Sequence, residues 1–333
     1  YHCLSSGINA EYMGGTVMAS ISSFPASTRL STATIKPSIF RRQPLTPRRD
    51  HFSVARSSLA KVHNLNLWRS LPTYVVRHMG HRVRSQVKDE HGIEDEACEL
   101  VNGEELDIRE GVNTIHAHLF KAVKNNNGTG ILLLSDIFGF EDSSTKDFAY
   151  RVACNGYNVL VPDLFHGDPW SKGRPQSMLK EWLGRQEPRR LANDIFISTK
   201  WLVDAFVAAG ISKKLGVIGF SFGGGGLLME ALARDRGSCF GTGVSFYGTG
   251  LDVSMAAGIK VPILFISGDG DSVCPASVLE GLRKRMDGSR IVIFEGRGDG
   301  FAHRPETPLD DRDAEDAFAL MRNWLHDGLI VKN

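Results

Sequence analysis

The stretch VIGFSFGGGG, from Val217 to Gly226, sets one serine among glycines between an apolar run and a segment of helical character. Its centre, GFSFG at 219–223, fits G-x-S-x-G, a pattern typical of a sharp strand-to-helix turn that exposes a nucleophilic serine. The alternative is a glycine-rich phosphate-binding loop. The stretch lacks the G-K-[ST] ending of such a loop, and its spacing is not G-x-G-x-x-G. We therefore expect Ser221 at a nucleophile elbow.

Strand-like and helix-like segments alternate on both sides of this stretch. Short apolar runs alternate with longer amphipathic ones, which predicts a mainly parallel sheet with helices on both faces. Ligands of such sheets bind at the carboxyl ends of the strands. One α/β domain is predicted over 94–330. Its expected strands are 98–101, 112–122, 130–139, 157–163, 214–220, 241–248, 261–268 and 290–296, and its expected helices are 145–156, 190–206, 222–234, 277–286 and 314–329.

Composition limits the classes of function. The chain has 333 residues, 42% of them hydrophobic, and a formal net charge of +1. No run reaches the roughly 18 apolar residues that a membrane span needs, and the balanced charge gives no reason to expect a nucleic-acid partner. The five cysteines stand at irregular spacings without a C-x-x-C pair, so neither a zinc site nor a disulfide framework is indicated. A soluble monomer or homodimer is expected.

The first 88 residues differ in composition from the rest. From Tyr12 to Lys88 the single acidic residue is Asp50, while arginines and lysines are interleaved with serine, threonine and proline. Such a segment is typical of a transit peptide, and a disordered basic tail has a similar composition. We predict a transit peptide and disordered leader over 1–88, with Met13 or Met18 as the start of translation. The abundance of serine and threonine favours the chloroplast over the mitochondrion or the cytoplasm.

An elbow serine needs an acid and a base, which follow it in the chain in that order. Asp269 and Asp271 stand at the carboxyl end of the expected strand 261–268, in FISGDGDSVCP. Asp271 is the preferred acid because Pro275 follows it at the distance of an acid-bearing loop. The base should follow the expected strand 290–296. The residues found there are GRGDGFAHRP, 296–305.

Taken together, four motifs resemble the dienelactone hydrolase (carboxymethylenebutenolidase) family over about 94–329. They are DIFG at 136–139, GFSFGG at 219–224, GDGD at 268–271 with its following proline, and GF at 300–301 followed by His303 and Arg304. The resemblance implies an α/β-hydrolase fold and hydrolysis of small lactones or activated esters without a metal or organic cofactor.

The resemblance also implies roles for individual residues. Ser221 would be the nucleophile and Asp271 the acid. The backbone N–H groups of Phe222 and Ile137 would form the oxyanion hole. Around them, the substrate pocket would be lined by Asp136, Phe138 and Arg304. His166, after the expected strand 157–163, is expected at the same pocket and is a more distant candidate for the base.

Two positions depart from the family pattern. Ser221 stands where the family usually has cysteine, and Asp299 stands where it has the catalytic histidine of an H-G-F motif. A serine hydroxyl needs a general base to take its proton before it can attack. A cysteine needs such a base less, because its thiol ionises more readily. An aspartate is ordinarily a weak base, although a second carboxylate beside it would raise its pKa.

Two interpretations of the base stay open. His303 lies four residues after Asp299 and would replace the missing histidine if the loop turns helically, or it merely lines the pocket. Two functions follow. The first is a serine hydrolase of lactones or esters in which His303, or less favourably Asp299, takes the proton. The second is a catalytically impaired member of the family that keeps its pocket for ligand binding or a structural role. A further alternative is that Asp299 is itself an allelic or sequencing change from histidine.

Overall fold

The computed structural model describes residues 73–76, 101–211 and 213–331, which all belong to one unit of the chain. A short strand, β1 (Thr73–Val76), pairs in parallel with β9 (Arg290–Phe294). This strand falls inside the range 1–88 and was not anticipated from the sequence. The remainder of 1–88 lies outside the described residues, so the leader stays a prediction.

The described strands form one nine-stranded sheet in the order β1-β9-β8-β7-β6-β4-β5-β3-β2. Among the described strands, β3 alone is antiparallel to the others, and it pairs with β2 on one side and β5 on the other. All other neighbouring pairs are parallel. The predicted mainly parallel sheet is confirmed. The remaining strands are β2 (Val101–Glu110), β3 (Asn113–Ala122), β4 (Gly130–Leu134), β5 (Asn158–Pro162), β6 (Leu215–Phe220), β7 (Phe240–Phe246) and β8 (Ile263–Gly268).

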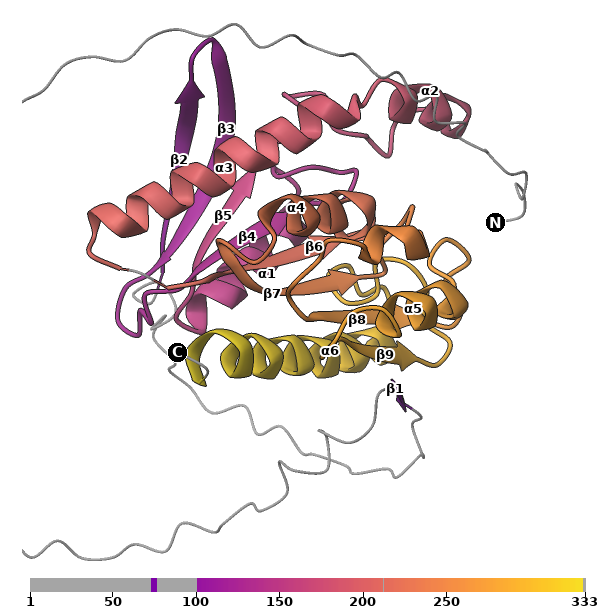
Figure 1. Ribbon diagram of the computed structural model, residues 1–333. Helices are drawn as coiled ribbons and strands as arrows, with labels where there is room; N and C mark the ends of the chain where they lie inside the picture. The colour runs from indigo at the N-terminus through magenta and orange to yellow at the C-terminus, as the bar shows by residue number, and fades with distance from the viewer. Residues whose placement is uncertain (1–72, 77–100, 212, 332–333) are drawn as a thin grey trace, which may run out of the picture. The chain divides into compact units, whose positions relative to one another are not determined.

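Helices cover both faces of the sheet, and Figure 1 shows the two long ones, α3 and α6, on opposite sides. Side chains of α3, α4 and α5 join one buried apolar cluster, and those of α1 and α6 join the other. Neighbouring residues of β4 alternate between the two clusters, as the period of a strand requires. The helices are α1 (Ser143–Cys154), α2 (Leu179–Gly184), α3 (Pro188–Ala208), α4 (Leu228–Asp235), α5 (Ala276–Arg283) and α6 (Pro308–His326).

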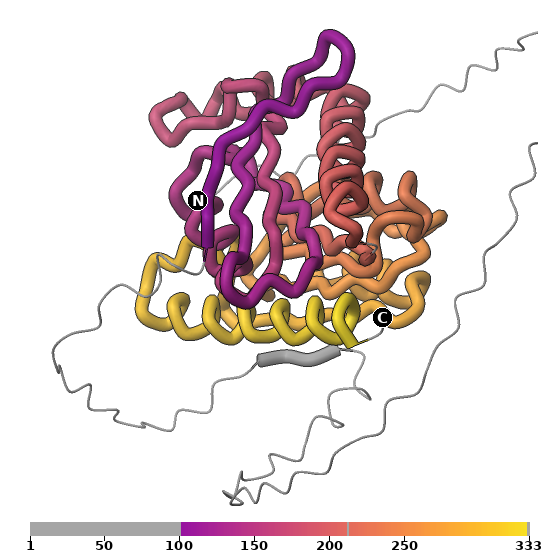
Figure 2. The backbone as a smooth tube through the Cα atoms, turned by 90° about the vertical axis from the view of Figure 1, so that its left-hand side faces the viewer, coloured from indigo at the N-terminus to yellow at the C-terminus, as the bar shows by residue number. Residues whose placement is uncertain are grey.

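The β2–β3 hairpin is the largest departure from the expected elements. A strand was predicted at 98–101, whereas β2 runs from Val101 to Glu110 and pairs along its whole length with β3. Most of β2 is exposed or half-buried, because only one of its faces packs on the core. Figures 1 and 2 show the tip of this hairpin extending beyond the neighbouring strands.

Candidate active site

Ser221 follows β6 directly and has a left-handed backbone, with a φ of 45°. Such a conformation is uncommon for a residue other than glycine and costs free energy, so the surrounding structure must hold it. The carbonyl oxygen of Ser221 accepts a hydrogen bond of 2.9 Å from the N–H of Thr249, which follows β7. Ser221 thus lies at the carboxyl edge of the sheet in the strained turn that the sequence predicts.

The glycines of the motif are required by close backbone contacts. A Cβ atom on Gly219 would lie 2.5 Å from the carbonyl oxygen of Gly223, and one on Gly223 would lie 2.4 Å from that of Ser135. Both contacts are with backbone atoms, which cannot rotate away as a side chain can. Gly223 therefore lets the helix that follows Ser221 approach the end of β4.

The two expected oxyanion donors come from neighbouring strands. The Phe222 N–H lies in the first turn after the elbow, where helical N–H groups have no partner within the helix. Ile137 lies in the loop after β4, and β4 pairs with β6 in parallel, with Leu134 opposite Gly219. This loop is held by the Asp136 carboxylate, which accepts a hydrogen bond of 2.9 Å from the Phe138 N–H. The pairing brings the loop of Ile137 beside the elbow.

Asp299 is the group that faces Ser221. The Ser221 hydroxyl lies close enough to the Asp299 carboxylate to lower the pKa of that carboxylate. Burial by surrounding protein atoms and repulsion from Asp271 outweigh this effect and raise the pKa of Asp299 to about 6, although the residue as a whole is exposed to solvent. Ser221 and Asp299 do not form a closed hydrogen bond within the described residues. Catalytic hydrogen bonds often tighten only when substrate is bound.

Asp271 lies beside Asp299 and is buried, 7% exposed. Its Oδ1 accepts hydrogen bonds from the N–H groups of Val273, at 2.9 Å, and Cys274, at 3.3 Å. Its Oδ2 is buried and has no hydrogen-bond partner among the described residues. Burial raises the pKa of Asp271 against the effect of these two hydrogen bonds. A histidine at position 299 would offer a ring N–H to this region, whereas an ionised Asp299 offers none.

His303 is turned away from the elbow. Its side chain is 1% exposed and is stacked on the ring of Phe220, with 4.1 Å between centroids. Its Nε2 lies 3.1 Å from Oδ2 of Asp136, and its Nδ1 is hydrogen-bonded to the Tyr247 hydroxyl. Burial lowers the pKa of His303 and raises that of Tyr247 well above its ordinary value. A neutral imidazole therefore accepts from Tyr247 at Nδ1 and donates to Asp136 at Nε2, so both nitrogens are engaged.

Arg304 joins the same network. Its guanidinium donates to the carboxylate of Asp136, with Nη2 2.9 Å from Oδ2, and also to the carboxylate of Asp142. The cation lies 4.7 Å from the centre of the Phe138 ring. Burial alone would raise the pKa of Asp136, but the hydrogen bond from His303 and the charge of Arg304 lower it. Arg304 thus ties both ends of the loop that carries Ile137.

His166 has a different set of partners. It lies after β5 with a φ of 50°, and its Nε2 is 2.9 Å from Oδ2 of Asp194 on α3. The carboxylate of Asp194 also accepts from Arg190 at 3.1 Å. Within the described residues, no contact joins His166 to Ser221.

Tyr247 was missed by the sequence analysis. It directly follows β7, is fully buried and has a φ of 39°. Its place at the carboxyl end of a strand next to the elbow strand was the available signal. In the sequence, however, Tyr247 falls inside the expected strand 241–248, where it resembles an ordinary core residue.

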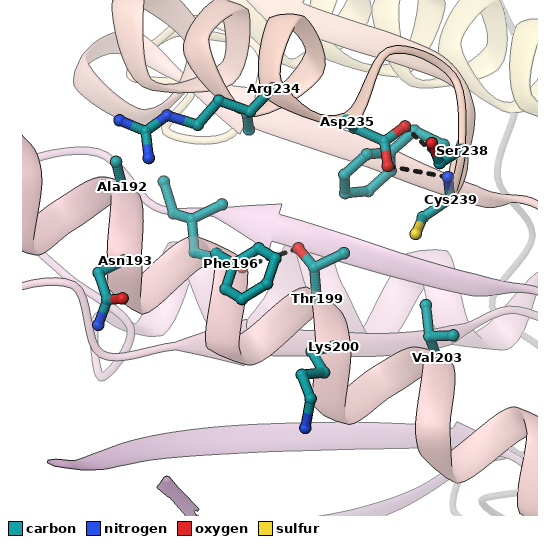
Figure 3. A pocket seen from close by; sticks show the side chains of 13 residues that line it. Ala192, Asn193, Phe196, Thr199, Lys200, Val203, Arg234, Asp235, Ser238 and Cys239 are labelled. Atoms are coloured by element: carbon teal, nitrogen blue, oxygen red, sulfur yellow. Dashed lines mark hydrogen bonds between the residues drawn. The ribbon is translucent and has the colours of Figure 1, made fainter. Parts of the chain in front are cut away.

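A cavity of about 600 Å³ lies elsewhere on the molecule, between α3 and α4 (Figure 3). Phe240, at the first residue of β7, is one of its lining residues. Since β6 and β7 are parallel, the start of β7 lies at the opposite edge of the sheet from Ser221. This cavity is therefore separate from the elbow.

The strained serine, the two loop carboxylates and the nearby backbone donors define a hydrolase-like site on an α/β-hydrolase fold. The family model of the dienelactone hydrolase family matches residues 115–329, and the chain belongs to that family. None of the helices in the described part of the chain combines the length and the apolar character of a membrane span.

Relatives and solved structures agree with this assignment. The chain is 30% identical over 210 residues to the carboxymethylenebutenolidase homolog of Rattus norvegicus, a match that covers 60% of this chain and 82% of the relative. The human homolog is 29% identical over 210 residues, with the same coverage. A putative dienelactone hydrolase from Klebsiella pneumoniae has a similar fold, with a TM-score of 0.58 and 20% identity over 67% of this chain and 98% of its own.

Proposed function

We propose that this chain hydrolyses a small lactone or activated ester through Ser221, with Asp299 as the general base. The observation that carries the proposal is a serine in a strained backbone conformation beside a carboxylate whose pKa is raised to about 6. The names of the carboxymethylenebutenolidase homologs support the lactone class of substrate. Membership of the dienelactone hydrolase family supports hydrolysis.

The acylation step moves one proton and one acyl group. The Ser221 oxygen attacks the carbonyl carbon as Asp299 takes the hydroxyl proton, and the charge on the carbonyl oxygen is stabilised by the N–H groups of Phe222 and Ile137. Collapse of the tetrahedral intermediate breaks the bond to the leaving oxygen, which takes the proton from Asp299. In a lactone this oxygen stays attached to the acyl chain. A water molecule then attacks the acyl carbon as Asp299 takes its proton, and the bond to the Ser221 oxygen breaks as that oxygen takes the proton from Asp299, which releases the acid and restores Ser221.

A carboxylate suits this role only if it holds protons more tightly than an ordinary aspartate does. A pKa of about 6 brings Asp299 close to an unperturbed imidazole, near 6.5. Repulsion from Asp271 is one of the causes of this rise. Asp271 would thus strengthen the base by repelling its negative charge, whereas the acid of a Ser-His-Asp triad stabilises a positive imidazolium.

His303 is not assigned the proton transfer. The lone pair of its Nδ1 accepts from the Tyr247 hydroxyl, and its Nε2–H is directed to Asp136. To serve Ser221, the imidazole would have to leave both buried partners and its stacking on Phe220, which costs free energy.

The second candidate function is the impaired family member that binds a ligand without turning it over. One observation favours it: among the described residues no imidazole contacts Ser221, and a carboxylate stands where the family has its catalytic histidine. Under this interpretation the pocket and the oxyanion donors stay available to a carbonyl-containing ligand.

Hydrolysis of p-nitrophenyl acetate by four proteins separates the two functions. The proposal expects measurable wild-type activity that falls about 10²–10⁴-fold in Asp299→Asn and at least as far in Ser221→Ala. The impaired function expects wild type and Asp299→Asn to be equally inactive, while Asp299→His gains activity. Wild-type activity that survives Asp299→Asn would refute Asp299 as the base. Circular dichroism checks that each variant is folded.

A further inference from the structure

A second group of ionisable side chains lies on the β2–β3 hairpin, away from the elbow. In the antiparallel register Glu105 faces His118, and Asp107 faces His116. Residues two apart on a strand point to the same side of the sheet. One face of the hairpin therefore carries two histidines and two carboxylates, opposite the face whose side chains join the α3 side of the core.

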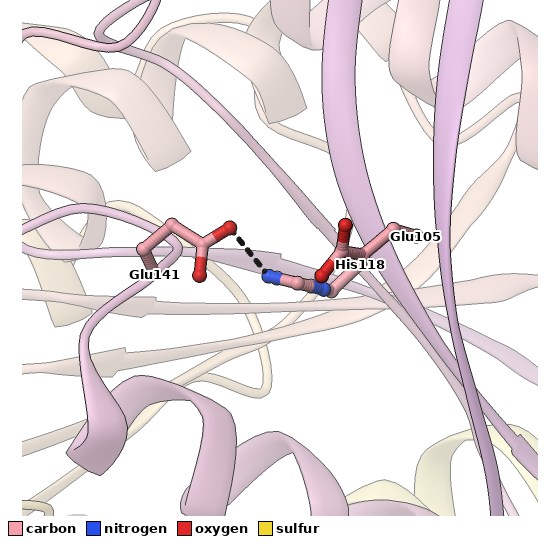
Figure 4. A group of neighbouring side chains, drawn as sticks. All are labelled: Glu105, His118 and Glu141. Atoms are coloured by element: carbon pink, nitrogen blue, oxygen red, sulfur yellow. Dashed lines mark hydrogen bonds and ion pairs between the residues drawn. The ribbon is translucent and has the colours of Figure 1, made fainter.

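Glu141, in the loop between β4 and α1, completes this group. Its Oε1 lies 3.0 Å from Nε2 of His118, and its Oε2 accepts a hydrogen bond of 3.0 Å from Lys146. Figure 4 shows Glu105 and Glu141 flanking the imidazole of His118. One ligand atom from each of these three residues lies within 4.8 Å of the other two.

His118 differs from an ordinary surface histidine in its burial. Its side chain is 9% exposed, and its ring lies 5.0 Å from the ring of Phe140. Its Nδ1 has no hydrogen-bond partner within the residues that the structure describes. The protein thus holds the buried imidazole between two carboxylates that are themselves exposed.

A cavity of about 410 Å³ opens beside these residues, lined by Glu105, Asp107, His116 and Glu141 among others. Its negative charge is not balanced in full by nearby cations. Arg109 pairs with Asp107 at 3.3 Å and Lys146 with Glu141, whereas Glu105 forms no ion pair with any described residue. A divalent cation would compensate this excess of carboxylates, and the cavity leaves room for water as a further ligand.

We propose that Glu105, His118 and Glu141 bind a divalent transition-metal ion, with Zn²⁺ as the fitting member of this class. Imidazole nitrogen and carboxylate oxygen are both ordinary zinc ligands at about 2.0–2.2 Å. Three donors at that distance from one tetrahedral ion lie about 3.4 Å apart, so the separations, which are at most 4.8 Å, must shrink by up to about 1.4 Å. Rotation of exposed glutamate side chains supplies that movement.

The site would connect two parts of the fold. Glu105 and His118 belong to the hairpin, and Glu141 belongs to the loop that also carries Asp136 and Ile137. A bound ion would therefore fix the hairpin to this loop, and we expect it to raise the melting temperature of the protein, because a ligand that binds the folded state alone stabilises it. This inference does not depend on the hydrolase activity.

Isothermal titration of the EDTA-treated full chain with ZnCl₂ tests the proposal. Glu105 and Glu141 are exposed, so Glu105→Gln and Glu141→Gln should not disturb folding. Each variant should weaken one zinc-binding event by about ten-fold or more and abolish the zinc-dependent rise in melting temperature. Glu104→Gln is the matched control, because Glu104 is the adjacent glutamate on β2, points to the other face and pairs with Lys121 at 2.6 Å.

Histidines elsewhere in the chain can also bind zinc. The test therefore compares the zinc titration of each variant with that of the wild type. His118→Gln should remove the same event as the two glutamate variants, and the absorption of bound Co²⁺ should change with it. The proposal is overturned if both glutamate variants titrate as wild type does, or if Glu104→Gln loses the event equally. In the first case His118 is only hydrogen-bonded to Glu141.

Discussion

Replacing Asp271 by asparagine should shift the pH dependence of hydrolysis without removing the base. Asp299 must be ionised to take the proton from Ser221, so kcat/KM should fall as the pH falls through about 6 in the wild type. Asp271→Asn removes the neighbouring negative charge and should lower the pKa of Asp299. Burial is the larger cause of the raised pKa and remains, so the new value should stay above the ordinary 3.8.

The size of the effect follows from these two causes. Asp271 is the second-largest cause of the raised pKa, after burial, so the acid limb of the profile should move to lower pH in Asp271→Asn. At pH 5, a base with a pKa of about 6 is about one-tenth ionised, so kcat/KM relative to its plateau should rise at that pH by at most about ten-fold.

The assay is the pH profile of kcat/KM for p-nitrophenyl acetate between pH 4 and pH 8, with each enzyme normalised to its own plateau. This normalisation separates the shift from any loss of rate caused by the substitution. His303→Gln is a useful comparison, because its profile should keep the wild-type midpoint. An acid limb that stays in place in Asp271→Asn, or one that moves in His303→Gln instead, would refute the reasoning.

Three further predictions concern the framework. Gly223→Ala puts a Cβ atom 2.4 Å from a backbone carbonyl oxygen and should destabilise the fold by ~1–3 kcal/mol or more in urea unfolding, while Gly184→Ala, whose Cβ meets nothing within 4 Å, should be near neutral. Tyr247→Phe leaves a buried imidazole nitrogen without its donor and should cost about 1–3 kcal/mol; Tyr157→Phe, which loses no hydrogen bond within the described residues, is the control. Residues 13–88 fused to a fluorescent reporter should carry it into plastids, and a purely cytosolic signal would contradict the transit peptide.

The elbow was predictable from the sequence because its constraints are local. A serine at positive φ flanked by glycines that touch backbone leaves a signature within a few residues, and the alternation of strand and helix around it defines the sheet. The hairpin strand β2 was predicted poorly for the opposite reason. Its edge position leaves most of its side chains exposed, so it carries little of the apolar pattern on which strand prediction depends.

The start of α6 shows a different kind of miss. The helix was expected from Ala314, but it begins at Pro308 after Thr307, whose hydroxyl accepts from the Asp310 N–H. A threonine cap, a proline in the first turn and acidic residues after it form a helix-start signal that was present in the sequence. The first turn is exposed, so it has no apolar stripe to reveal it.

The orientation of His303 could not be read from spacing. The loop does turn helically after Asp299, since the N–H of Arg304 donates to the carbonyl oxygen of Gly300 at 2.8 Å. A helical turn places residues four apart on the same side, but it does not say which of two neighbouring side chains enters the core. That choice is made by Tyr247 and Asp136, which come from distant parts of the chain and offer buried partners to both ring nitrogens.

The segment from Asp299 to Arg304 therefore divides two tasks among its side chains. Asp299 faces Ser221, while Arg304 pairs with Asp136 and Asp142 at the two ends of the loop that carries Ile137. His303 donates to the same Asp136 carboxylate, so in the proposed mechanism it would help to position the expected oxyanion donor rather than move a proton. Under the proposed mechanism His303 is a positioning residue, and Asp299 is the group beside Ser221, within the described residues, that would act as its base.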